Sequence, residues 1–251
     1  MRALKWLLVM GLVAVVSGVG AVPAALAAGK EDGSSPKPQK MVFIHFHSGY
    51  AGVPAIEARG PKPKGFYDLI AKGFRWKADP PEAFVVNPSG SGLADEFVLD
   101  ALTAAMAEWE TYGGGSIFGS AALGTAEFDD THMDEVNAIS FGALPEGIIA
   151  VTVYWGVWWG PPSGRYMAET DILFNTLYYT WGDAVTAPDP SVIMDLQNIA
   201  THELGHAAGM DDLYKPPAAQ ETMFGYSTEG EIKKRTLDIG DQIGIYKLYN
   251  E

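Results

Sequence analysis

The chain of 251 residues contains no cysteine, which excludes disulfide bonds. Its stability must therefore come from an apolar core, from metal ions or from both. With 47% hydrophobic residues, the chain is long enough to bury one sizeable core. We expect a single main domain with at most a short appendage.

Basic residues are also scarce: 17 lysines and arginines stand against 31 aspartates and glutamates, and the formal net charge is −14. Such a surface repels nucleic acid and anionic lipid, so neither is expected as a partner. Histidine is rarer still, with five in the whole chain. Each histidine is therefore informative about a candidate metal site.

Long uncharged runs are confined to the N-terminus. Arg2 and Lys5 precede an apolar stretch that ends in small residues, with an Ala-x-Ala cleavage site after Ala27. Residues 1–27 therefore have the form of a signal peptide, which predicts a secreted, extracellular protein without stable membrane association after cleavage. Cleavage leaves 15 basic against 31 acidic residues, a formal charge of −16. The alternative is an uncleaved membrane anchor, because the run is nearly long enough to span a bilayer.

Residues 28–73 are predicted to be a linker or pro-segment in front of a main domain over 74–251. Polar residues and prolines dominate the start of this segment. Residues 41–47 (MVFIHFH) alternate well enough for a strand on which His45 and His47 share one face. Plain strand positions are the preferred interpretation of these two histidines over a metal site, because no third ligand lies nearby.

The main domain combines strand-like and helix-like apolar patterns, which predicts an α/β (α+β) fold with a mixed, twisted sheet and a backing helix. Strands are predicted over 83–86, 116–126, 136–141, 147–155 and 167–175. Helices are predicted over 93–112, with Val98, Leu102, Ala105 and Trp109 facing the core, over about 190–208, with Asp189 as N-cap, and over 237–249, with Ile239, Ile243 and Tyr246 on one face.

An acidic cluster separates two of these predicted strands. It contains Glu127, Asp129, Asp130, His132, Asp134 and Glu135. A solvated loop is the preferred interpretation. A calcium (Ca2+) or second metal site is the alternative, given the number of hard oxygen ligands gathered there.

Residues 199–212 (IATHELGHAAGMDD) carry most of what a zinc hydrolase needs. On a helix, His202 and His206 project from one face about 6 Å apart along the axis, so both imidazoles can reach one ion. This is the HExxH arrangement. Glu203 points away from the histidine pair towards a metal-bound water, where it would act as a general base and not as a ligand.

Gly209 is expected to end this helix, because glycine adopts a positive φ without a Cβ clash. The following turn would bring Asp212, six residues after His206, to the metal as the third ligand. Asp211 is the competing carboxylate, and spacing alone favours its neighbour. The alternative to a metal site is a chance match on an amphipathic helix, but a stop glycine plus a further ligand makes the pattern far more specific.

These residues resemble the extended signature of the metzincin metalloproteases, HExxHxxGxx(H/D). Asp212 stands where most members have histidine, as in snapalysin-type and some other microbial metzincins. The segments 137–142 (NAISFG), 150–152 (AVT) and 169–175 (ETDILFN) are similar to matrixins, so the resemblance covers roughly 74–249. It implies a zincin-like fold with a zinc helix, a Met-turn and a C-terminal helix. The absence of cysteine excludes the cysteine switch of many matrixins.

The resemblance also implies roles for residues outside the zinc motif. Met223 resembles the methionine of the Met-turn, with ordinary core packing as the alternative. Tyr226 is expected to wall the pocket for the residue after the scissile bond and not to bind zinc. By matrixin analogy, Ile149, Ala150 and Val151 would lie on an edge strand that receives substrate backbone. An interior strand is the alternative, because this stretch is apolar on both faces.

The predicted function is therefore that of an exported zinc-dependent endopeptidase. One Zn2+ ion held by His202, His206 and Asp212 would activate water, and Glu203 would take and deliver its proton. A protein or peptide is the expected partner, and the protein is expected to be a monomer. The alternative is a non-catalytic exported metal-binding or envelope protein that keeps the fold. An enzyme held latent by residues 29–73 is a further hypothesis.

Overall fold

The computed structural model describes residues 36–50, 66–77 and 83–251. The chain divides into two compact units, Met1–Lys37 and Pro38–Glu251. The predicted signal peptide and its cleavage site lie outside the described residues. Among the residues described, no helix is both long and apolar enough to cross a membrane.

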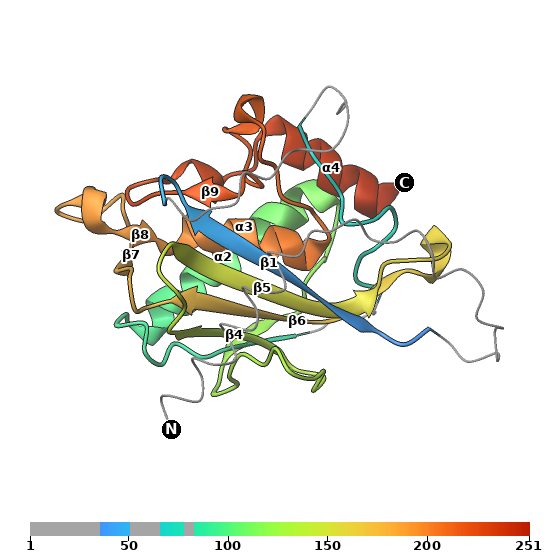
Figure 1. Ribbon diagram of the computed structural model, residues 1–251, viewed down its shortest axis with the longest axis horizontal. Coiled ribbons are helices and arrows are strands. Elements are labelled where there is room, and N and C mark those ends of the chain that lie inside the picture. Colours follow the sequence, from blue (N-terminus) through green and yellow to red (C-terminus); the bar gives the residue numbers. More distant parts are fainter. Residues whose placement is uncertain (1–35, 51–65, 78–82) are drawn as a thin grey trace. The chain divides into compact units, whose positions relative to one another are not determined.

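A seven-stranded mixed sheet runs through the second unit in the order β3-β2-β4-β6-β5-β1-β9 (Figure 1). Strands β2, β3, β4 and β6 are mutually parallel, whereas β5 runs antiparallel to both of its neighbours. The strands are β1 (Gln39–His47), β2 (Phe84–Val86), β3 (Ala121–Leu123), β4 (Asn137–Gly142), β5 (Ile148–Val157), β6 (Tyr166–Asn175) and β9 (Tyr226–Ser227); β7 (Trp181–Gly182) and β8 (Met194–Asp195) form a separate pair.

Helices α2 (Asp95–Gly113), α3 (Leu196–Ala208) and α4 (Ile239–Asn250) accompany the sheet. Helix α2 packs against both of the other helices, and α3 contacts β5 (Figure 1). Short 3-10 turns are η1 (Pro162–Gly164), η2 (Pro190–Val192), η3 (Pro216–Ala218) and η4 (Lys233–Arg235). The predicted α+β class with a mixed sheet is confirmed.

The helix predicted over 93–112 is confirmed as α2, and its predicted core face is buried. The last predicted helix, α4, turns differently from the expectation. Ile239 and Tyr246 are exposed, whereas Ile245 and Leu248 face the core. Glycines decide this rotation: a Cβ on Gly244 would lie 2.5 Å from the terminal carbon of Met210, so that face can approach closely.

The predicted domain boundary at residue 74 is wrong, because the compact unit begins at Pro38 and includes β1. Strand β1 pairs with β5 from Gln39 to Phe46 and continues onto β9. The strand pattern of 41–47 was visible in the sequence, but strand pairing depends on a partner more than one hundred residues away. Residues 28–73 are therefore not a linker throughout.

The prediction of an edge strand at Ile149, Ala150 and Val151 is also corrected. These residues lie on β5, whose two sides are hydrogen-bonded to β6 and β1. An interior strand has no free backbone edge to offer a substrate. The interior alternative explains why the stretch is apolar on both faces, since nearly all of β5 is buried.

Candidate metal centre

Helix α3 presents the HExxH residues and begins later than predicted. Asp189 caps the 3-10 turn η2, whereas Asp195 caps α3 by accepting a hydrogen bond from Asn198 N at 2.9 Å. The helix ends at Gly209, which adopts φ 102°. A Cβ there would lie 2.5 Å from the Phe74 carbonyl oxygen, so both the turn and the close approach require glycine.

Met223 packs against helix α3 between the two histidines of the motif. Met223 lies in a tight turn closed by the hydrogen bond from Phe224 N to Glu221 O at 3.2 Å, and its side chain is fully buried. A Cβ on Gly205 would meet Met223 Sδ at 2.2 Å. The predicted turn methionine therefore packs against the helical turn between His202 and His206.

The two histidines direct the same ring nitrogen at the same place. His202 Nδ1 lies 2.7 Å from Thr222 O, and His206 Nδ1 lies 3.0 Å from Met210 O. A carbonyl can only accept, so both Nδ1 atoms carry the proton and donate it. With Nδ1 engaged, Nε2 of each ring is the nitrogen left to bind a metal ion, which is how a metal-ligating histidine is normally held.

Asp212 supplies the third atom of this group. Its Oδ1 lies 3.2 Å from His202 Nε2 and 3.5 Å from His206 Nε2. Ligands about 2.05 Å from a tetrahedral zinc ion are about 3.3 Å apart, so these separations fit one shared ion. All three atoms are buried and have no hydrogen-bond partner. Asp211, the competing carboxylate, instead accepts from Asp212 N at 2.9 Å.

The remaining oxygen of Asp212 is held by Tyr214, whose hydroxyl donates to Oδ2 at 2.8 Å. Burial acts to raise the pKa of Asp212, but His206 and His202 outweigh burial and hold that pKa well below its usual range. Asp212 is therefore ionised, as a metal ligand must be. The sequence analysis did not identify Tyr214. The one signal for it in the sequence was its position two residues after Asp212.

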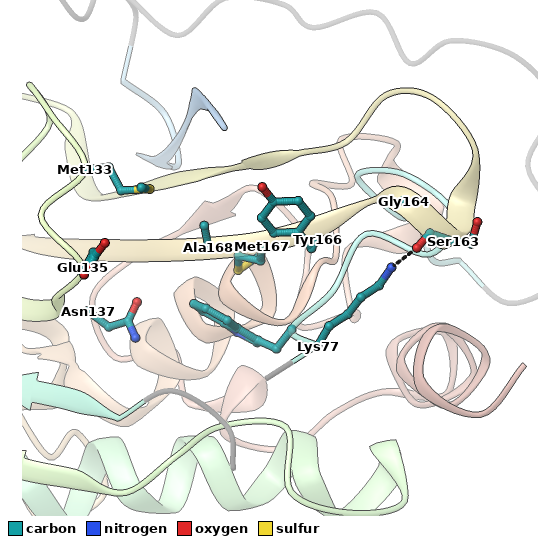
Figure 2. A pocket seen from close by; sticks show the side chains of 10 residues that line it. Lys77, Met133, Glu135, Asn137, Ser163, Gly164, Tyr166, Met167 and Ala168 are labelled. Atoms are coloured by element: carbon teal, nitrogen blue, oxygen red, sulfur yellow. Dashed lines mark hydrogen bonds between the residues drawn. The ribbon is translucent and has the colours of Figure 1, made fainter. Parts of the chain in front are cut away.

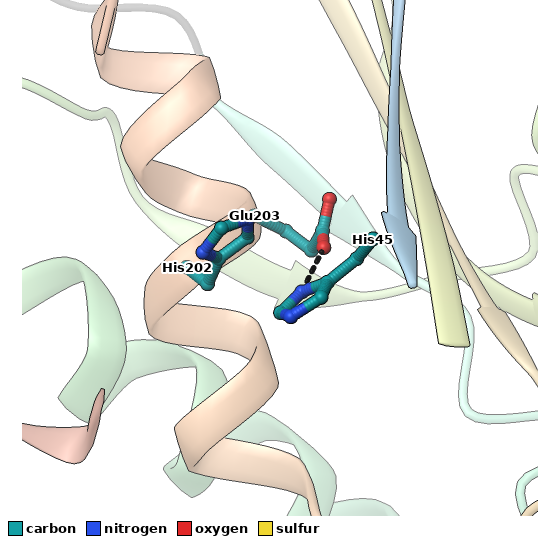
Figure 3. Close-up of side chains that lie close together, drawn as sticks. All are labelled: His45, His202 and Glu203. Carbon is teal, nitrogen blue, oxygen red and sulfur yellow. Dashed lines mark hydrogen bonds and ion pairs between the residues drawn. The ribbon is translucent and has the colours of Figure 1, made fainter. Parts of the chain in front are cut away.

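Glu203 extends from α3 away from His202 and towards His45 on β1 (Figure 3). Thr152 Oγ1 donates to Glu203 Oε2 at 2.6 Å, and His45 Nδ1 lies 3.0 Å from Oε1. Burial raises the pKa of Glu203 to about 7, against the influence of His206 and Thr152. A carboxyl with that pKa can exchange protons near neutrality, as a general base requires.

His45 is the main residue whose role the sequence analysis missed. Its Nε2 lies 3.1 Å from Lys234 Nζ, which can only donate, so Nε2 accepts and Nδ1 donates to Glu203. Lys234 is itself fully buried, bonded to the carbonyl oxygens of Phe224 and Tyr226. Burial lowers the pKa of Lys234 to about 8. The sequence held one signal of this network, the histidine on a predicted strand.

The candidate site is closed to solvent in this structure. His202, Glu203 and His206 have no exposed surface. Two side chains of β1 cover the histidines, since Phe43 stacks on His206 with ring centroids 4.0 Å apart and the His45 ring lies 3.9 Å from that of His202. Access to the group therefore depends on β1.

The other predicted site residues lie at the margin. Tyr226, on β9, packs edge-on against Tyr214 with centroids 5.4 Å apart, and forms no hydrogen bond to the three ligand atoms. Its role as a pocket wall stays a prediction. His47 does not join His45 at the site, because a register shift in β1 follows His45 and His47 Nε2 bonds Glu229 Oε2 at 2.8 Å.

The acidic loop is organised differently. Asp171 on β6 accepts from Ala138 N at 2.8 Å and from Asp129 N at 2.7 Å, and Glu169 accepts from the backbone amides of Asp134 and Glu135. Across the described residues, the metal-ligating groups that meet closely are His45 with His202 and Glu203, and His202 with His206 and Asp212. Calcium in the acidic loop stays an untested prediction.

A pocket of about 560 Å³ opens elsewhere, lined partly by Lys77, Asn137 and Tyr166 (Figure 2). Lys77 Nζ donates there to Ser163 O at 2.6 Å. None of the HExxH residues lines this pocket. This pocket is therefore separate from the candidate metal centre.

Comparison with known proteins adds no assignment. No protein-family model matches the chain, and a search of curated proteins finds no match. The site must be interpreted from its own chemistry.

Proposed function

We propose that the protein is an exported zinc-dependent endopeptidase of the metzincin type. The observation that carries this proposal is the set of three buried atoms, His202 Nε2, His206 Nε2 and Asp212 Oδ1, which lack hydrogen-bond partners. Leaving one buried polar atom unpaired costs about 1–3 kcal/mol, so three that converge at 3.2 and 3.5 Å favour a shared cation as their common partner. A nitrogen, nitrogen and carboxylate set at these separations suits zinc.

When bound, zinc supplies a Lewis acid that polarises a carbonyl and acidifies water. The chain supplies the rest. Thr222 and Met210 carbonyl oxygens fix the histidine tautomers, and Tyr214 fixes the carboxylate. Glu203, the residue beside the first ligand and not itself one of the three, would accept the proton of the attacking water and deliver it to the leaving amine.

The resemblance noted in the sequence supports this proposal in order and spacing. Met223 packs under the histidine turn of α3, where the Met-turn hypothesis would have it. The N-terminal 27 residues would direct export, and the substrate would be a protein or peptide. These points rest on the sequence and stay proposals.

A second candidate function is a non-catalytic exported metal-binding protein. The observation in its favour is that both Glu203 oxygens are already hydrogen-bonded and the side chain is fully buried. A protein that only holds a metal could use such a glutamate to join α3 to the sheet. The two candidates therefore differ in whether Glu203 reacts.

Replacing Glu203 with glutamine separates them. The amide keeps the shape and one acceptor oxygen but cannot take a proton at neutral pH. Under the proposal, zinc binding stays stoichiometric while hydrolysis of a denatured protein falls by about 10²–10⁴-fold. Both proteins are compared in a Phe43→Ser background, because Phe43 stacks on His206 and covers the site. Equal hydrolysis by Glu203→Gln and the parent would reject Glu203 as the base.

A further inference from the structure

We propose that Lys234 is a positioning residue for Glu203 and that it acts through His45. This inference rests on the proposed function, in which Glu203 is the base. Within the described part of the chain, Lys234 Nζ bonds three groups, and Glu203 is not among them. The role of Lys234 is to set the direction of the hydrogen bond between His45 and Glu203.

The side chain of Lys234 is buried without a carboxylate partner among the described residues. An ammonium group has three donors, and those of Lys234 go to Phe224 O, to Tyr226 O at 3.1 Å and to His45 Nε2 at 3.1 Å. The side chain has no exposed surface. A buried charge is costly unless it is compensated, so a lysine at this position favours a role in the site over one in packing.

Lys234 is held in place by the helix that carries Glu203. It lies on η4, and its backbone N–H donates to Asn198 Oδ1 on α3 at 2.8 Å. The next residue, Arg235, bonds Asp195, which caps the same helix. Glu203 lies farther along α3. The ammonium group is therefore fixed relative to the proposed base by bonds to one helix.

His45 could carry its proton on either ring nitrogen, and Lys234 decides between them. Ser227 Oγ lies 3.1 Å from His45 Nε2, but a hydroxyl donates or accepts and so suits both tautomers. The ammonium of Lys234 can only donate, so it selects the tautomer without a proton on Nε2. The proton is then on Nδ1, which lies 3.0 Å from Glu203 Oε1 (Figure 3).

This tautomer fixes Glu203 from a second side. Thr152 Oγ1 donates to Oε2 at 2.6 Å, and His45 donates to Oε1. The other tautomer of His45 would place a nitrogen lone pair against Oε1 and turn the carboxylate away. With both bonds made, each oxygen keeps a second lone pair. The direction of the base is thus set before a substrate arrives, as a reactive group requires.

The tautomer of His45 can be measured in the full-length protein without any substitution. The chain has five histidines, so 15N-labelled histidine gives a small set of ring signals in NMR spectra. The signals that disappear in His45→Gln assign the residue. We expect Nδ1 to carry the proton and Nε2 to lack it. Any other protonation state of this ring overturns the inference.

Two matched variants on η4 then separate Lys234 from its neighbour. Lys234→Met removes the donor and keeps most of the length of the side chain, so the His45 proton should move to Nε2 in part or all of the molecules. Lys233→Met makes the same change one residue earlier, where the lysine pairs with Glu231 at 3.1 Å. This control should leave the His45 tautomer unchanged.

Hydrolysis of a denatured protein is compared in the same variants, zinc-loaded and carrying Phe43→Ser. Lys234→Met should lower kcat by about 10–100-fold, the usual cost of losing a bond that supports a functional group. KM and zinc stoichiometry should not change, and Lys233→Met should keep the parent kcat. In a Glu203→Gln background, Lys234→Met should lower the residual rate no further, because both changes act on the same group.

The inference and the proposed function can fail separately. If Lys234→Met keeps either the His45 tautomer or the parent kcat, the inference is overturned and the proposed function stands. An equal loss of rate in the parent and Glu203→Gln backgrounds also overturns it, because the lysine would then support the fold and not the base. Failure of the Phe43→Ser protein to take up zinc or to hydrolyse the substrate overturns the proposed function, and the inference with it.

Discussion

Two buried polar clusters, one around α3 and one beside β6, differ in how their polar atoms are paired. Around α3, three ligand atoms converge with no hydrogen-bond partner. Beside β6, Asp171 has both oxygens engaged by backbone amides, and Glu169 has one oxygen so engaged. The second cluster holds more acidic residues, yet the first has the geometry of a metal site. Glu169 Oε1 is also buried without a partner, but among the described residues it stands alone. Convergence of several unpaired ligand atoms, and not the number of acidic residues, therefore marks a candidate metal centre.

The difference follows from what each cluster does for the fold. Most of the amides bonded to Asp171 and Glu169, those of Asp129, Asp134 and Glu135, belong to the loop before β4, so these carboxylates hold that loop onto the sheet. In the α3 cluster the Nδ1 atoms of His202 and His206 donate to backbone carbonyl oxygens. Their Nε2 atoms are therefore left to face Asp212. Substitutions in the two clusters test this difference, and they are given in descending order of their expected effect on zinc affinity.

The largest effect is expected from His206→Ala, which removes one of three ligands. Zinc affinity should fall by more than about 100-fold, the upper range for residues one step removed from a metal. The matched control is His132→Ala in the acidic loop, where the histidine is exposed and affinity should not change. Chelator competition measures both. Equal losses at the two positions would show that zinc binds histidine non-specifically.

Substitutions at Asp212 should rank next. Asp212→His offers a neutral ligand, so zinc should remain bound with measurable activity, and the acidic limb of the pH–rate profile should move to lower pH. Asp212→Leu cannot coordinate and should lose zinc, whereas Asp211→Asn, which keeps an acceptor for Asp212 N, should retain it. Equal zinc retention by the His and Leu variants would place position 212 outside the ligand set.

Tyr214→Phe should have a moderate effect. It removes the hydroxyl that donates to Asp212 Oδ2 and leaves the ring in place. Loss of such a supporting bond typically costs about 10–100-fold in metal affinity. Tyr226→Phe is the control, because the Tyr226 ring packs nearby and its hydroxyl forms no hydrogen bond to the ligand atoms. If the two phenylalanine variants bind zinc equally well, the Tyr214 bond does not support the ligand.

Asp171→Asn is expected to leave zinc affinity unchanged. It should instead change the pH dependence of the free energy of unfolding. Burial raises the pKa of Asp171 to about 7, against the amide bonds from Asp129 and Ala138. A carboxyl whose pKa is raised in the folded state stabilises that state at pH values below its unfolded pKa. This stabilisation is lost as the pH rises through the folded-state pKa. The parent should therefore lose up to about 4 kcal/mol relative to the variant between pH 4 and 7.

Urea unfolding at several pH values measures that difference. A constant gap between parent and Asp171→Asn across the range would contradict the assignment. Calcium provides the sharper challenge to the comparison itself. If calcium raises the melting temperature of the parent and Asp171→Asn abolishes the rise, the acidic loop is a metal site after all.

Local chemistry made part of this molecule predictable. The core face of α2, the helical stop at Gly209 and the tight turn at Met223 follow from periodicity, a glycine and a short turn segment. The α4 rotation was harder, because Gly244 acts through Met210, which is distant in the sequence. The start of α3 is marked by a local cap, Asp195 to Asn198 N, but Asp195 is also held by a distant residue. Arg235, for example, bonds Asp195 at 2.8 Å across 40 residues.

The spacing of His202, Glu203, His206 and Asp212 could be predicted, because helical geometry and a glycine that ends the helix are local properties. The residues that face them could not. That His45, more than 150 residues earlier, bonds Glu203 and that β1 lies along β5 emerges from the folded chain alone. Strand partners are chosen by long-range pairing and burial, which no local pattern encodes.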